Sequence, residues 1–189
     1  MGLTSGVIGT LEMRARLTDP KDSFNVSPLP ESRHVRSGSI NLRLGRTFLV
    51  ARRGAITAVA ADQPEESERA FEELRLATGE LLILHPRQFV LAVTQEYLSL
   101  PPDLCGFIQS RSTYGRMGLI AATATYVNPG YLGCPTLEIV NEGEVPISVA
   151  PGEPICQLIL LRADEDETTI EPSRYHCAVR PYPPRPSMS

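Results

Sequence analysis

The run FIQSRSTYGRMGLIAATATYVNPGYLGCPTLEIVN, from Phe107 to Asn141, contains the signals that decide the fold of this chain. It ends in Thr136–Val140, where the residue pattern is that of a strand buried on one face. The run Asn128-Pro-Gly130 before this strand predicts a turn, because Pro and Gly adopt the backbone angles that tight turns need. One acidic residue, Glu138, lies in the strand between apolar neighbours. We expect its carboxylate to be partly removed from water, which is how proteins tune a Glu for proton transfer.

The same run also gathers basic and hydroxyl side chains in one short segment. These are Arg111, Ser112, Thr113 and Arg116. A guanidinium group presents a planar fork of donors that suits phosphate, and hydroxyls and backbone amides add further donors. Taken singly, each of these residues, and Glu138 with them, is more readily explained as a solvated surface group. The motifs described below favour a shared site.

Short apolar runs typical of strands recur along the rest of the chain, at 40–44, 48–50, 81–84, 89–93, 97–100, 145–149 and 155–161. Turns such as His85-Pro86 and Pro151-Gly152 separate them, and we interpret His85 as a turn residue rather than a catalytic base. Short strands about ten residues apart predict a mainly β sandwich or barrel with few short helices.

The chain of 189 residues is predicted to form a single domain, residues 1–189. Residues 1–38 are expected to hold a helix and a loop, residues 39–161 the β core, and residues 162–189 a C-terminal tail. The helix is expected within Gly2–Arg16, with Asp19-Pro20 after it as a stop, since the residue before Pro avoids the helical region. Ser27–Ser39 is predicted to be a loop. Asp62–Glu73 is predicted to be an acidic surface excursion with room for one helical turn.

The composition excludes several classes of function. A net charge of -4 and a pI near 5.4 argue against general binding of nucleic acid or anionic membranes. The sequence has no signal peptide or membrane-spanning run, so we expect a cytoplasmic protein. The four cysteines (Cys105, Cys134, Cys156 and Cys177) and three histidines show no metal-ligand spacing. No metal site made of protein ligands is therefore expected, and Cys105 and Cys156 are predicted to be core residues.

The motifs SINLRLG (39–45), LHPRQFVLAVTQEYLSLPPDL (84–104), SRSTYGRMGL (110–119), NPGYLG (128–133), LEIVN (137–141) and PGEPICQL (151–158) resemble, in this order, those of the dCTP deaminase / dUTPase superfamily. Their spacing is most similar to the dCTP deaminase branch. The resemblance covers most of residues 35–161. It implies a distorted, dUTPase-like β-barrel or jelly roll and a homotrimer whose sites lie between subunits. It also implies conversion of dCTP to dUTP and ammonia. Zinc deaminases carry a P-C-x-x-C signature that this chain lacks, so deamination here is expected to be independent of zinc.

The resemblance assigns roles to individual residues. Glu138 matches the general base, while Ser112 and Arg116 match residues that position the water and hold charge beside the carboxylate. Arg111 matches a residue that faces the triphosphate, with Ser112 and Thr113 beside it.

Three further positions belong to the nucleotide site by the same resemblance. Gln157 matches a residue that helps to build it, Arg174 stands where a Lys reaches the phosphates, and Tyr175 begins a tail motif that closes over the triphosphate. The expected ligands are dCTP and dUTP, with dTTP as a candidate inhibitor. Mg²⁺ is expected to arrive on the triphosphate, held mainly by phosphate oxygens and water.

The chain departs from the family pattern at several positions. Asn128 stands where both branches usually have Asp, the residue that in dUTPases and bifunctional deaminases activates water for attack on the phosphate chain. An amide cannot act as a base, so we predict that the triphosphate is not hydrolysed efficiently, although the amide can still bind a sugar hydroxyl. Asn41 also replaces an Asp, Ser110 replaces a common Gly, and Ala178 breaks the tail motif.

Two alternatives to dCTP deamination follow from these departures. One is a nucleotide-binding or regulatory protein that has kept the fold and lost turnover. The other is a deaminase that acts on a modified or less phosphorylated cytosine nucleotide.

Overall fold

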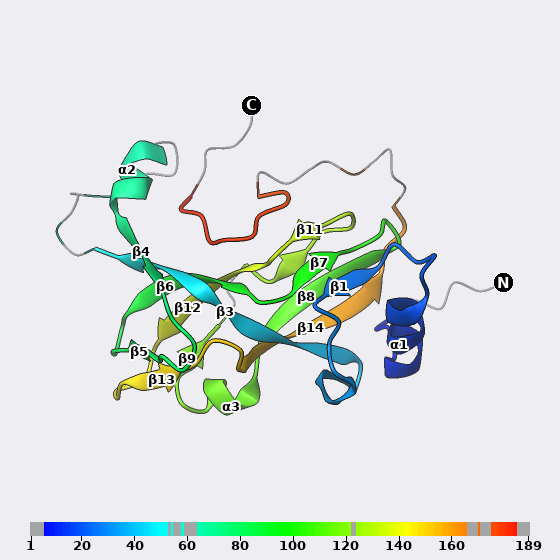
Figure 1. Cartoon of the computed structure of the whole chain (residues 1–189), viewed down its shortest axis with the longest axis horizontal. Coiled ribbons are helices and arrows are strands. Elements are labelled where there is room, and N and C mark those ends of the chain that lie inside the picture. The colour runs from blue at the N-terminus through cyan, green and yellow to red at the C-terminus, as the bar shows by residue number, and fades with distance from the viewer. Residues whose placement is uncertain are drawn as a thin grey trace.

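The computed structural model of the chain describes residues 6–52, 54, 58, 64–121, 124–165, 170 and 175–184. This part is mainly β, with few and short helices (Figure 1). The helices are α1 (Thr10–Thr18), the 3-10 helix η1 (Ser32–His34), α2 (Pro64–Arg69) and α3 (Ser112–Gly115). None of the described helices is long and apolar enough to cross a membrane.

The strands follow one another closely along the chain. They are β1 (Asn25–Ser27), β2 (Val35–Arg36), β3 (Ser39–Ala51), β4 (Phe71–Arg75), β5 (Leu82–Leu84), β6 (Phe89–Thr94), β7 (Tyr97–Ser99), β8 (Leu104–Ser110), β9 (Leu119–Ile120), β10 (Tyr126–Val127), β11 (Leu132–Gly133), β12 (Thr136–Asn141), β13 (Ile147–Val149) and β14 (Pro154–Arg162).

A curled 9-stranded sheet forms the body of the molecule (Figure 1). Its main path runs β10-β8-β14-β3-β6-β12-β9, and β2 and β4 both pair with β3. A smaller sheet has the order β1-β7-β11, and β13 pairs with β5. No pairing among the described strands joins β10 to β9, so closure into a barrel stays a prediction.

The core is built by the inward side chains of strands that alternate with a period of two. Leu137 and Ile139 of β12 are fully buried, as are Leu158 and Leu160 of β14. Their neighbours Glu138 and Gln157 are half-buried on the outer faces. The burial on one face that was predicted for residues 136–140 is confirmed in β12. The same alternation runs through most of β14. It points Glu138 away from the core.

One long strand, β3, replaces the two strands predicted at 40–44 and 48–50. The register against β6 shifts between Leu44 and Phe48, so the strand is irregular there without ending. Gly45 lies in this irregular stretch, where an added Cβ would come 2.8 Å from the carbonyl oxygen of Val93. The backbones approach so closely that only glycine fits, which explains a break in the sequence pattern without a break in the strand.

Two predicted loops contain more regular structure than expected. The segment 27–39 holds η1 and β2, and the acidic segment that ends at Glu73 leads from α2 into strand β4. Strand β4 pairs with β3 from Thr47↔Arg75 to Ala51↔Phe71. In the described sheet it pairs on one side only, and such a position tolerates charged side chains because water reaches them. The strands on either side of His85-Pro86 do not pair with each other, since β5 pairs with β13 and β6 pairs with β3 and β12.

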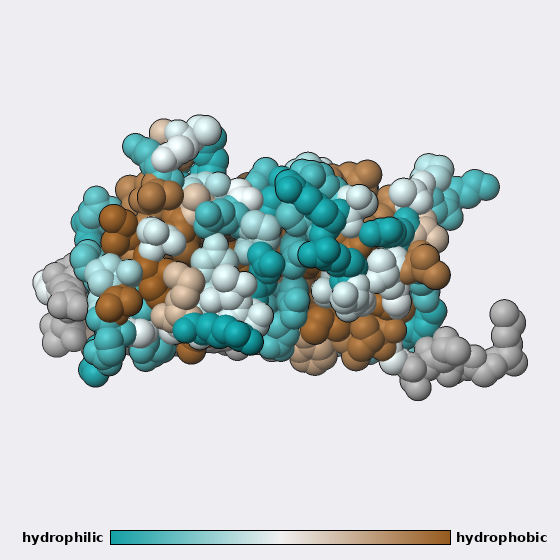
Figure 2. All heavy atoms as spheres, turned by 90° about the horizontal axis from the view of Figure 1, so that it is seen from below, coloured by the Kyte–Doolittle hydropathy of each residue, from teal (hydrophilic) through white to brown (hydrophobic). Residues whose placement is uncertain are grey.

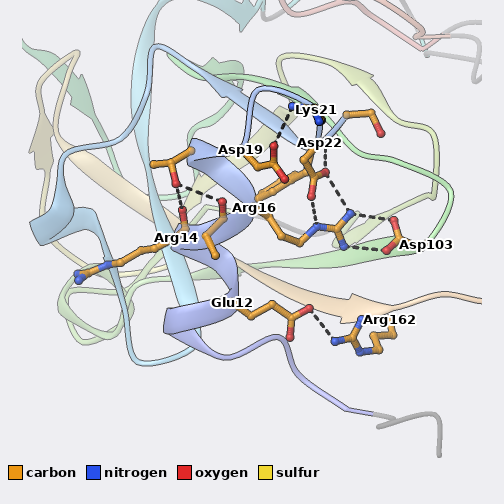
Figure 3. A network of polar contacts seen from close by, with 12 residues as sticks. Glu12, Arg14, Arg16, Asp19, Lys21, Asp22, Asp103 and Arg162 are labelled. Atoms are coloured by element: carbon orange, nitrogen blue, oxygen red, sulfur yellow. Dashed lines mark hydrogen bonds and ion pairs between the residues drawn. The ribbon is translucent and has the colours of Figure 1, made fainter. Parts of the chain in front are cut away.

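The N-terminal helix is fixed to the sheet by ion pairs (Figure 3). Arg16 of α1 contacts Asp22 and Asp103, each at 2.7 Å, and Glu12 contacts Arg162 of β14 at 2.6 Å. The helix ends at Thr18, immediately before Asp19-Pro20, as predicted. It begins at Thr10, whereas the segment predicted to contain it begins at Gly2.

A buried ion pair ties β3 to the end of β6. The side chain of Glu96 is only 1% exposed, and its carboxylate accepts hydrogen bonds from the backbone N–H and from Nε of Arg43, at 2.7 and 2.5 Å. Such a pair depends on both partners, since a buried charge without its partner is costly.

We expect Arg43→Met to lower the free energy of unfolding by about 3 kcal/mol, because Glu96 is left buried without its cation. The matched control is Arg52→Met, which removes a pair with Glu72 whose side chains are 53% and 62% exposed. That loss should stay below about 1 kcal/mol. Urea unfolding at one protein concentration measures both variants. Equal losses would show that the Arg43–Glu96 pair matters no more than a surface pair.

Candidate active site around Glu138

Strand β12 holds Glu138 in place by pairing on both sides. Glu138 lies opposite Leu91 of β6, and the end of β12 pairs with β9 through Val140↔Ile120. The half-buried position of Glu138 agrees with the predicted partial removal of its carboxylate from water.

A backbone amide orients the carboxylate. The N–H of Ala124 donates a hydrogen bond to Oε2 of Glu138 at 3.0 Å. This donor lies between β9 and β10, 14 residues before Glu138 along the chain. A carboxylate fixed in this way is available as a proton acceptor in one defined orientation.

A pocket of about 380 Å³ lies beside Glu138. It brings together three of the predicted site residues, Glu138, Asn128 and Tyr175. The other residues around it are mainly apolar or aromatic: Leu91, Ile108, Ala124, Tyr126, Val127, Tyr131, Pro135, Thr136, Tyr182 and Pro184. A concave, largely apolar pocket with a few polar groups is the usual form of a small-molecule site.

The described part of the tail, residues 175–184, forms one wall of this pocket. Main-chain hydrogen bonds hold it to β11, from Cys177 N to Leu132 O at 2.8 Å and from Cys134 N to Ala178 O at 2.7 Å. Ala178 pairs with Gly133, where an added Cβ would lie 3.0 Å from the Ala178 oxygen. Glycine therefore permits this close approach. Arg174 lies outside the described residues, and closure of the tail over a ligand stays a prediction.

Tyrosines that were not predicted as site residues also line the pocket. Tyr131 follows the Asn128-Pro-Gly130 turn, and burial raises the pKa of its phenol. Tyr126 packs against Phe107 with ring centroids 5.4 Å apart, and Tyr182 comes from the tail. The one signal for Tyr131 in the sequence is its place directly after the turn. Nothing in the sequence distinguishes Tyr126 and Tyr182 from ordinary surface tyrosines.

The basic segment forms a second cluster at α3. Arg111 is the N-cap residue of this helix, and its Nη1 donates to the carbonyl oxygen of Pro154 at 3.0 Å. Ser112, Thr113 and Arg116 are exposed. The cluster is therefore positioned on the surface, where a ligand or another protein chain can reach it.

Tyr114 fixes α3 to the start of β14. Its hydroxyl donates to Oε2 of Glu153 at 2.8 Å. Burial, together with this hydrogen bond to Glu153, raises the pKa of Tyr114 to about 12. The phenol therefore stays protonated, and remains a donor, throughout the neutral range.

The basic cluster does not line the Glu138 pocket of its own chain, among the residues that the structure describes. Arg111, Ser112, Thr113, Arg116 and Gln157 are not among the described residues that line the Glu138 pocket. Figure 1 shows α3 at the lower edge of the molecule, whereas the described tail crosses its upper half. Gln157 lies on β14, in register between two other polar residues, Asn41 of β3 and Gln109 of β8.

The face that carries α3 is mixed in character (Figure 2). Hydrophilic residues gather over its middle, and apolar residues gather at the end where Figure 1 draws β5 and β13. Leu81, Ile83 and Val145, from that part of the chain, are 55%, 53% and 64% exposed. Such a surface offers apolar area for contact with another protein chain.

The cysteines are free thiols. Cys105, Cys134 and Cys156 are buried, as predicted for Cys105 and Cys156, while Cys177 is exposed in the tail. Burial raises the pKa of Cys134 to about 11. Among the residues that the structure describes, no three His, Cys, Asp or Glu side chains come close enough together to hold a metal ion.

Comparison with known proteins relates this chain to dCTP deaminases by sequence. A family model described as dCTP deaminase-like matches residues 9–163. The chain is 38% identical over 137 residues to the "dCTP deaminase, dUMP-forming" of Methanobrevibacter smithii, which covers 71% of this chain and 70% of that protein. It is 35% identical over 154 residues to the dCTP deaminase of Natronomonas pharaonis, covering 80% and 78% of the two chains.

Among solved structures, the fold is similar to that of the 2'-deoxycytidine 5'-triphosphate deaminase from Agrobacterium tumefaciens. The TM-score is 0.65 at 21% sequence identity. The match covers 84% of this chain and 47% of that one, so this chain spans about half the length of that protein.

Proposed function

The chain belongs to the dCTP deaminase family, and from this premise we propose that it converts dCTP and water to dUTP and ammonia with Glu138 as the general base, without zinc. The observation that carries the proposal is the half-buried Glu138, oriented by the Ala124 amide at 3.0 Å and facing a pocket of about 380 Å³. A carboxylate in such a pocket can reach both a bound water and a pyrimidine ring.

In the proposed reaction, water attacks C4 of the cytosine while Glu138 removes one of its protons. Glu138 delivers that proton to N3. It then transfers the remaining proton of the new hydroxyl group to the exocyclic amine. The C4–N4 bond breaks, ammonia leaves, and C4 becomes the carbonyl of uracil. Both protons of the water are accounted for, one on N3 and one on ammonia.

Part of each site, including its triphosphate end, is proposed to come from a second copy of the chain in a homotrimer. Arg111, Ser112 and Arg116 lie on α3, outside the Glu138 pocket of their own chain, yet Arg111 is held firmly by Pro154. In the trimer, Ser112 and Arg116 of one copy would reach the water and the carboxylate of the next. Arg111, with Thr113 beside it, would face the phosphates, and Gln157 would support the nucleotide.

Mg²⁺ is proposed to enter with the substrate. The described pocket offers one carboxylate, Glu138, and one of its oxygens already accepts the Ala124 hydrogen bond. These groups are too few to enclose Mg²⁺, which prefers six oxygen ligands. The ion would be held by phosphate oxygens and water, where it neutralises phosphate charge.

The product is proposed to be dUTP rather than dUMP. The relative from Methanobrevibacter smithii is named as dUMP-forming. In this chain Asn128 lines the pocket, and its amide cannot remove a proton from a water that attacks the phosphate chain. Asn128 is left with a binding role, as a hydrogen-bond partner of the sugar.

We expect Glu138→Gln to reduce ammonia release from dCTP by about 10²–10⁴-fold, the usual effect of losing a general base. The matched control is Glu142→Gln, an exposed residue just beyond β12 that does not line the pocket. Ammonia release is measured over a panel of cytosine nucleotides, with pyrophosphate in the same tubes. Full turnover by Glu138→Gln would exclude it as the base. Nucleotide binding by the wild type without any ammonia release would favour the alternative of an inactive binding protein.

We expect two inactive variants to restore activity when they are mixed as subunits. If Glu138 and Arg116 of one site come from different copies, trimers assembled from equal amounts of Glu138→Gln and Arg116→Gln chains contain intact sites. Random assembly predicts activity at about one quarter of the sites. Unfolding and refolding the chains together, with each variant refolded alone as control, measures this. No recovery would show that both residues act within one chain.

We expect Asn128→Asp to release pyrophosphate from dUTP, because it restores a carboxylate at the turn that lines the pocket. Asn128→Ser, which provides no base, is the control. Pyrophosphate release by the wild type at the same rate as by Asn128→Asp would contradict the role given to this position.

A further inference from the structure

We infer that Ser110 is a positioning residue for Glu138, acting through the amides of Ala121 and Ala124; this inference rests on the proposed function. Ser110 is the last residue of β8, and its Oγ accepts a hydrogen bond from the N–H of Ala121 at 2.8 Å. The Ala121 residue is fully buried. Its amide therefore depends on a protein acceptor, since water does not reach it.

Three described residues between β9 and β10, namely Ala121, Ala124 and Thr125, are each held at one point by a hydrogen bond. Ala121 N–H is held by Ser110, Ala124 N–H is held by Glu138, and Thr125 O accepts from the N–H of Ile108 at 2.8 Å. Two of these three points lie on β8, at Ile108 and Ser110. The third is the carboxylate itself.

In this inference, the ties at Ala121 and Thr125, which flank Ala124 along the chain, restrict where the Ala124 amide lies. The tie at Thr125 uses the main chain of Ile108, so no side-chain substitution removes it directly. The tie at Ala121 uses the hydroxyl of Ser110, so it depends on the residue type at position 110. Only residues 122 and 123 separate Ala121 from Ala124. Loss of the hydroxyl would let the Ala124 amide move, and with it the orientation of the carboxylate.

Ser110 also precedes Arg111, the N-cap residue of α3. Ser110 thus contacts Ala121 through its side chain and is bonded through the main chain to Arg111 of the basic cluster. Ser110 does not line the pocket, so it acts through the Ala121 amide rather than on the substrate.

We expect Ser110→Ala to lower kcat for dCTP by about tenfold with KM changed by less than about twofold, because misplacement of a catalytic group affects the chemical step rather than ground-state binding. Ser110→Thr keeps a hydroxyl and should recover most of the loss. Ser148→Ala, at an exposed position of β13, is the matched control and should leave both constants unchanged. A tenfold loss shared by Ser110→Thr, or an unchanged kcat in Ser110→Ala, would overturn the inference.

Amide hydrogen exchange tests the same link without turnover. In Ser110→Ala we expect the amides of Ala121 and Ala124 to exchange about tenfold faster than in the wild type, with neither changed in Ser148→Ala. Faster exchange at Ala121 alone would contradict the link to Glu138. If the wild type releases no ammonia from dCTP, the proposed function fails, and exchange at Ala124 still decides the inference. Ser110→Cys, with a weakly accepting sulfur of similar size, gives the same readout if Ser110→Ala does not fold.

Discussion

The pairing of β12 with β6 and β9 is the constraint on which the rest of the site depends. A strand with one buried face has a strict register, because a slip by one residue would turn every side chain to the opposite face. Leu137 and Ile139 are fully buried and hold β12 in this register. Glu138 consequently faces outward, opposite Leu91, beside the pocket. The register set by these apolar residues thus fixes Glu138 at a half-buried position beside the pocket.

The sequence was most informative where structure depends on neighbouring residues. The one-sided burial of β12, the partial burial of Glu138 and the stop of α1 before Asp19-Pro20 follow from local patterns and were predicted correctly. The continuity of β3 was not predicted, because it depends on a close approach of Gly45 to the carbonyl of Val93. Nor was strand β4, whose acidic residues resemble those of a solvated loop and which pairs with β3.

The candidate site could be predicted in part for the same reason. Glu138, Asn128 and Tyr175 were expected at one site and line one pocket. Their aromatic neighbours Tyr126 and Tyr182 were not predicted as pocket residues. They line the pocket only because β10 and the tail fold against the sheet. The burial of Glu96 is also invisible in the sequence, since its partner Arg43 lies on a different strand. That the described residues of α3 do not line the Glu138 pocket depends on the three-dimensional fold, which local sequence patterns do not reveal.

The tail docks on β11 through main-chain atoms, from Cys177 to Leu132 and from Cys134 to Ala178. Such bonds are insensitive to the identity of the side chains, as in recognition of peptides by strand addition. The contact can therefore persist while residues 176–178 drift in evolution, provided that proline does not remove a donor at 177. The side chains of the tail can therefore change while its main-chain contact with β11 is kept. Such changes would alter which ligands the tail contacts without releasing it from β11.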